Sequence, residues 1–205
     1  LRRKVLYLTY GDVAPEQPVT DINLSKGKDG SVQLQTISYD GNPVDIKNFK
    51  TQQEADKYIS DSGIDDIADR NKTDFLQKAS SQYVLSKATN KAIHDVAASQ
   101  QVGIDKMADI ITRSAAGDKL TAAEKNLIKD VNDKINSDTS YLEETNILQR
   151  ASSDLGTDIK KMLDKPKSQR TQDEQSAVES YRQYLVKSIS PEENGRIEQG
   201  NVINK

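Results

Sequence analysis

His94 is the only histidine in this sequence and the first residue that could act as a general base. On a helix, the residues three and four positions away from it are Asn90, Lys91, Ala97 and Ala98. None of them is a usual metal ligand or a nucleophile, so a Ser/His/Asp triad would need distant parts of the chain. This pattern favours an ordinary helix histidine. The chain also has no cysteine, which excludes disulfides, thiolate catalysis and cysteine-ligated metal sites.

A group of four aspartates is the second candidate for chemistry: Asp61, Asp65, Asp66 and Asp69. The group lacks the alternating oxygen ligands and the terminal glutamate of an EF-hand loop, so it favours a solvated acidic connector over a cation site. No Gly-x-Gly-x-x-Gly motif occurs, and residues 27–30 lack the Lys-Ser/Thr ending of a phosphate loop. We therefore predict no catalytic residues, no cofactor and no metal ion.

One enzymatic alternative stays open, namely an enzyme or effector with a carboxylate-based site between a strand-rich head and the helices that follow it. Such a site requires a pocket lined by converging Asp, Glu or Arg side chains with displaced pKa values. Only the folded chain can decide this alternative, because the sequence does not show which distant carboxylates lie together.

The balance of charge argues against a nucleic-acid or anionic-membrane surface. The formal net charge is −3, from 29 Lys and Arg against 32 Asp and Glu, and the two signs are interspersed. A nucleic-acid-contacting protein stays an alternative because of two basic groups. These are the N-terminal Arg2, Arg3 and Lys4, and the cluster of Lys160, Lys161, Lys165, Lys167 and Arg170. No apolar run approaches the roughly 18 residues that span a bilayer, so we expect a soluble protein, with its compartment open.

The longest element that could position these residues is a helix predicted over residues 73–100. This stretch contains neither Gly nor Pro, and its apolar residues recur mostly at steps of three to five. They form one wide stripe: Phe75, Leu76, Ala79, Tyr83, Ala88, Ala92, Ile93, Val96 and Ala97. A stripe of this length needs other elements to cover it.

A small strand-rich head is predicted over residues 1–60, before this helix. Asp29-Gly30 lies between alternating apolar runs, which is a strong hairpin signal. The strands are expected at Lys4–Tyr10, Thr20–Ser25, Ser31–Ser38 and around Val44, Ile46 and Phe49. A capping box over Thr51–Glu54 begins one helix. Residues 61–72 are expected to form the acidic connector.

An all-helical region is predicted over residues 73–205. Capping boxes predict helix starts at Thr121, Thr171 and Ser190, with a weaker one at Ser140. The helix expected from Ser140 to Asp164 has a continuous apolar seam, although Gly156 could break it. Its members are Leu142, Leu148, Ala151, Leu155, Ile159 and Met162. The fold class is therefore α+β, mainly α: a small antiparallel sheet with one helix, then an elongated bundle of about five to six amphipathic helices.

The function predicted from these features is a non-enzymatic helical assembly or interaction module. Apolar residues make up 34% of the chain and there is no Trp, so long helices with few large side chains favour partner surfaces that complete the burial. We expect a protein partner or self-association, with nucleic acid not favoured. The cysteine-free, polar composition is compatible with a virus particle or an exported machine. The interaction candidates are Leu142, Leu148, Leu155, Ile159, Tyr181 and Tyr184.

Overall fold

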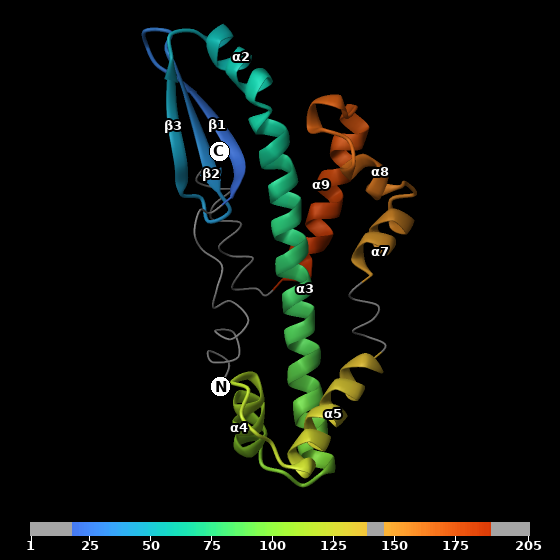
Figure 1. The fold of residues 1–205 in the computed structure, drawn as a ribbon. Coiled ribbons are helices and arrows are strands. Elements are labelled where there is room, and N and C mark those ends of the chain that lie inside the picture. The colour runs from blue at the N-terminus through green and yellow to red at the C-terminus, as the bar shows by residue number, and fades with distance from the viewer. Residues whose placement is uncertain (1–17, 139–145, 190–205) are drawn as a thin grey trace. The chain divides into compact units, whose positions relative to one another are not determined.

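The computed structural model describes residues 18–138 and 146–189 (Figure 1). Within these ranges it contains a three-stranded antiparallel sheet, seven α-helices and one short 3₁₀ helix. The predicted fold class, mainly α with a small β head, is confirmed. The strand expected at Lys4–Tyr10 and the helix starts expected at Ser140 and Ser190 lie outside the described residues.

The chain divides into two compact units, which we describe separately. The first unit comprises Leu1–Ser80 and Ile147–Lys205, and the second comprises Ser81–Asn146. The head and the C-terminal helices thus belong to one unit, although they lie far apart in the sequence. Whether the head folds independently over residues 1–60 stays a prediction.

The sheet of the first unit is built from β1 (Val19–Lys26), β2 (Val32–Ser38) and β3 (Pro43–Phe49), in the order β1-β2-β3. Alternation along the central strand decides which face is covered. Val32 and Leu34 are each 1% exposed, whereas Gln33 and Gln35 form hydrogen bonds on the open face. Helix α2 (Gln52–Ser62) packs on β2 and β3 and buries Ala55 completely.

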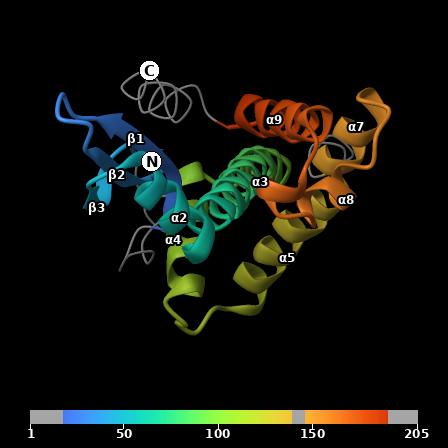
Figure 2. The same ribbon diagram turned by 90° about the horizontal axis from the view of Figure 1, so that it is seen from above.

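Strand β3 is an outer strand of this sheet, as Figures 1 and 2 show. Its predicted position is confirmed, but its apolar side chains are not buried. Val44 and Ile46 are 46% and 47% exposed. The edge of the head therefore presents apolar side chains beside backbone groups that no fourth described strand covers.

Helix α3 (Ile64–Ser99) follows α2 after a single residue, Gly63. Gly63 has φ 63° and donates its N–H to the carbonyl of Ile59, which is a left-handed helix end that glycine adopts without a Cβ penalty. The helix predicted over residues 73–100 therefore begins at Ile64, and most of the expected acidic connector is helical. The aspartates there lie on the first turns of a long helix.

The C-terminal part of the first unit contains α7 (Ile147–Asp154), α8 (Ile159–Leu163), η1 (Lys167–Gln169) and α9 (Gln172–Lys187). The predicted single helix from Ser140 to Asp164 is wrong. Gly156, with φ 63°, lies in the break after α7, and the Asp158 side chain caps α8 by accepting the N–H of Lys161. The core here consists of Leu76, Ala79, Ile147, Ala151, Ile159, Tyr181, Leu185 and Ile189.

The second unit consists of the remainder of α3 with α4 (Ile104–Ala115) and α5 (Ala122–Asn136). Its core is small: Ala92, Val96, Ala97, Met107 and Val131. The capping box predicted at Thr121 is present, as is the one at Thr171 in the first unit. The pKa of Glu124 is lowered to about 2, because its carboxylate accepts hydrogen bonds from the Thr121 N–H, from the Arg113 side chain and from the Thr121 hydroxyl.

The break at Gly156 predicts that Leu155 tolerates a charge. Leu155 is 37% exposed, so Leu155→Asp is expected to change the free energy of unfolding by no more than about 0.5 kcal/mol. The control Ile159→Asp places a carboxylate in the core and should unfold this unit. Urea denaturation followed by circular dichroism measures both changes. Equal destabilisation by the two substitutions would contradict the break.

Candidate functional site

The carboxylate of Asp69 is the centre of the most buried charged cluster among the described residues. Its side chain is 5% exposed and accepts from two arginines, each at 2.6 Å. Arg170 binds one oxygen from the segment before α9, and Arg182 binds the other from within α9. The side chains of these arginines are 3% and 8% exposed. Three segments of the first unit therefore meet at one carboxylate.

Hydrogen bonds satisfy the remaining polar groups of this cluster. Arg182 also donates to the Thr73 hydroxyl and, at 2.8 Å, to the backbone carbonyl of Asp69. Thr73 lies one helical turn after Asp69 on the same face of α3. Arg170 donates to the carbonyl of Met162 at 2.8 Å. The cluster is thus a closed network, which is the arrangement that allows charges to be buried.

The electrostatics of the network fix the charge state of Asp69. Burial opposes ionisation of this carboxyl, but the hydrogen bonds and charges of Arg182 and Arg170 outweigh it and hold the pKa of Asp69 below its ordinary value. Both oxygens of the carboxylate are occupied by guanidinium groups. An ionised carboxylate held in this way is a poor general acid or base, because it is buried from substrates and its two arginines lower its affinity for a proton.

A second row of contacts joins the first turn of α3 to η1. Lys167 contacts Asp65 at 2.7 Å, and the N–H and hydroxyl of Ser168 both donate to Asp66 at 3.0 Å. Three of the four aspartates of the expected solvated connector thus bind the segment around η1, and of these only Asp69 is buried. Only Asp61 pairs locally, with Lys57 at 2.8 Å.

Ion pairs engage three of the five cations in the basic cluster that supported nucleic-acid binding, whereas Lys160 and Lys161 are exposed on α8. Lys165 pairs with Glu174, Lys167 with Asp65 and Arg170 with Asp69. A surface that binds phosphates needs cations that are not already matched by carboxylates. The acidic and basic segments seen in the sequence are thus partners of each other. The N-terminal Arg2, Arg3 and Lys4 lie outside the described residues.

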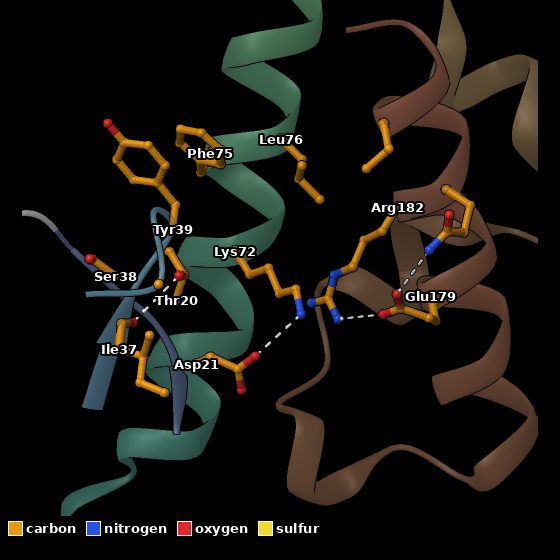
Figure 3. A pocket seen from close by; sticks show the side chains of 13 residues that line it. Thr20, Asp21, Ile37, Ser38, Tyr39, Lys72, Phe75, Leu76, Glu179 and Arg182 are labelled. Atoms are coloured by element: carbon orange, nitrogen blue, oxygen red, sulfur yellow. Dashed lines mark hydrogen bonds and ion pairs between the residues drawn. The ribbon is translucent and has the colours of Figure 1, made fainter. Parts of the chain in front are cut away.

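A small cavity lies beside this network, between the sheet, α3 and α9 (Figure 3). On the sheet side, the Tyr39 ring stacks on Phe75 with centroids 4.1 Å apart, and Lys72 contacts Asp21 at 3.5 Å. On the α9 side, Arg182 contacts Glu179 at 3.3 Å. The cavity is therefore lined by charged side chains that already face partners of opposite charge.

The size of this cavity limits its chemistry. The space that water-sized groups can occupy is about 50 Å³, which holds a few waters and is far below the roughly 300–1,000 Å³ of typical ligand pockets. No group of three or more His, Asp or Glu side chains in the described part of the chain is arranged to hold a metal ion. The cavity thus offers little support for a carboxylate-based enzyme between head and helices.

The interaction candidates from the sequence occupy different environments. Ile159 and Tyr181 are 0% and 2% exposed, and Tyr181 accepts a hydrogen bond from Gln77. Leu148 and Tyr184 are partly buried against the same core. Leu155 is exposed, and Leu142 lies outside the described residues. His94, the candidate base, lies exposed on α3.

Sequence inspection missed the Asp69 network, although two signals for it were present. Asp65, Asp69 and Thr73 recur every four residues, which places them on one helix face. Arg182 lies within the apolar stripe of α9, between the buried Val178 and Leu185. A cation inside an apolar stripe indicates a buried partner of opposite charge, because an unpaired buried charge is costly.

Asp69→Asn is expected to lower the free energy of unfolding by roughly 3–5 kcal/mol, because it removes the buried counter-charge of two arginines and leaves Arg182 only the exposed Glu179. The control is Glu179→Gln, which removes the exposed partner of the same Arg182 and should cost less than about 1 kcal/mol. Urea denaturation of both variants tests this difference. Similar losses in the two variants would show that Asp69 is not the anchor.

The depressed pKa of Asp69 also predicts a pH dependence. Its stabilisation should be fully present above the unfolded-state pKa of about 4 and should be lost as pH falls through the lower folded-state pKa. The stability difference between the parent and Asp69→Asn should therefore be constant from pH 7 to about 4 and shrink below it. Urea titrations across this range measure the difference. A difference that shrinks well above pH 4 would contradict the assignment.

Comparison of the chain with protein-family models, curated protein sequences and solved structures found no significant match. None of the helices in the described ranges is long and apolar enough to cross a membrane. Function must therefore be argued from the residues themselves: a closed ionic network, a cavity of water size and an open sheet edge.

Proposed function

We propose that the chain is a non-enzymatic assembly module that associates with other protein chains through its strand-rich head. The observation that carries this proposal is the distribution of exposed apolar side chains. Among the described residues, seven large apolar side chains are exposed, and four of them lie in the head. These four are Leu24, Tyr39, Val44 and Ile46. Two of them lie on the outer strand β3, and exposed apolar side chains on an outer strand are typical of interaction surfaces.

The helices of the first unit support this choice of surface because most of their large apolar side chains are buried, although Ile67 of α3 is exposed. Tyr181, Leu185 and Ile159 are buried in their own core, and the charged face of α3 is bound by Arg170, Arg182 and Lys167. A partner could reach these groups only by opening the unit. The exposed head strands require no such opening.

The setting of this module is a separate proposal that composition supports. A chain without cysteine does not depend on the redox state of its compartment. A component of a virus particle or of an exported machine therefore fits the composition. In both settings a small module would work by association with neighbouring chains.

Sedimentation equilibrium over a range of concentrations tests the assembly function. The parent is expected to exceed its monomer mass of 22.8 kDa as concentration rises. The double change Val44→Thr with Ile46→Thr should weaken association by about tenfold, because threonine keeps strand propensity but removes apolar surface. The matched control is Leu85→Gln, which alters an exposed apolar residue of α3.

Leu85→Gln should associate as the parent does. A parent that sediments as a monomer at every concentration would contradict the assembly function. Association that is weakened equally by the head and helix substitutions would contradict the choice of the head as the surface.

A further inference from the structure

We infer that the partner of the β3 edge is a second copy of this chain, paired antiparallel with β3 in a register centred on Ile46. This inference rests on the proposed assembly function and names its partner and geometry. The two sheets would then join into one continuous sheet around a twofold axis. Each copy contributes the same strand, as in an isologous dimer.

Backbone hydrogen bonding identifies which groups of β3 face the open edge. The N–H of Ile46 donates to the carboxylate of its own neighbour Asp45 at 2.8 Å, whereas the carbonyl of Asp45 accepts from the Thr36 hydroxyl of β2. Backbone groups of successive residues in a strand point to opposite sides. Ile46 and Asn48 therefore direct their N–H and carbonyl groups away from β2, whereas a register shift between Thr36 and Ile37 interrupts the alternation at Val44. No described strand pairs with this side of Ile46 and Asn48.

The charges of β3 select the register. With Ile46 opposite Ile46 of the second copy, Asp45 lies opposite Lys47 of that copy, and Lys47 lies opposite its Asp45. A register centred on Asp45 would place two aspartates face to face, and one centred on Lys47 would place two lysines together. Like charges directly opposite each other destabilise a strand pair. The sequence Asp45-Ile46-Lys47 is thus complementary to itself in one central register.

The side chains on the two faces are compatible with this arrangement. Asp45 and Lys47 contact each other at 3.2 Å within one chain and are about half exposed, so they can exchange partners at little cost. On the opposite face, Ile46 would contact Ile46 of the second copy, and Val44 would lie diagonal to it. Both side chains lose exposed apolar surface in the pair.

Asp45 would also limit which strands can pair with this edge. In the single chain the Asp45 carboxylate accepts the Ile46 N–H. Charged side chains on edge strands commonly prevent pairing with unrelated strands. Only a strand that offers a cation opposite Asp45 would draw this carboxylate away from the N–H. The second copy supplies that cation as Lys47.

A charge exchange in the full chain tests this geometry. Asp45→Lys alone and Lys47→Asp alone should each raise the dimer dissociation constant by about tenfold, because each places like charges opposite one another twice. The double change Asp45→Lys with Lys47→Asp should restore the parent value. A mixture of the two single variants should form heterodimers, since their charges are then complementary. Sedimentation equilibrium measures all four cases, and urea denaturation confirms that each variant is folded.

Amide hydrogen exchange supplies a second readout. Dimer formation should slow exchange at Ile46 and Asn48 in the parent and leave Asp45 and Lys47 unchanged. If none of the charge changes altered the dimer dissociation constant, the proposed register would be wrong, while the assembly function would still stand. A parent that stays at 22.8 kDa at every concentration would overturn the assembly function itself.

Discussion

The buried carboxylate of Asp69 is the interaction on which the first unit depends. A carboxylate that is 5% exposed is tolerated only with counter-charges and hydrogen bonds, and both arginines that supply them come from the C-terminal part of the chain. Removal of either arginine would leave one oxygen of this buried carboxylate without its guanidinium partner. The segment that carries Arg170 and the helix that carries Arg182 must therefore dock together, and partial docking is costly. Because the contacts of this network form and break together, we expect the first unit to be either fully folded or broadly unfolded.

The position of these partners in the sequence shapes how the unit can form. Asp69 and Arg182 are separated by 113 residues, and Ser81–Asn146 form a compact unit of their own within that separation. Contacts of such long range close late, because the entropy of a long loop is lost before they form. Until Arg170 and Arg182 are present, the carboxylates of the first turns of α3 have only water and local lysines as partners. We therefore expect the head and the C-terminal helices to complete their folding together.

Local features of this fold were predictable from the sequence, and long-range ones were not. The hairpin at Asp29-Gly30 and the boxes at Thr121 and Thr171 depend on residues at most a few positions apart, so pattern alone identifies them. The pairing of Asp69 with Arg170 and Arg182 depends on residues that only the tertiary fold brings together. Gly156 marks a weak point in the sequence, but only the structure shows the capping by Asp158 that makes the break favourable. The exposure of Val44 and Ile46 also required the sheet order, since an outer strand and a central strand share the same alternation.

The contrast between a closed helical interior and an open sheet edge constrains what kind of assembly this chain can form. An edge of one seven-residue strand buries far less area than the roughly 1,600 Å² of a standard stable interface. Pairing there would be weak in dilute solution, and the Asp45 carboxylate that covers the Ile46 N–H would weaken it further. Weak pairing becomes effective when copies are held close together, because a high effective concentration compensates for the low affinity. A module of this design is therefore expected to be monomeric in dilute solution and to associate as its concentration rises.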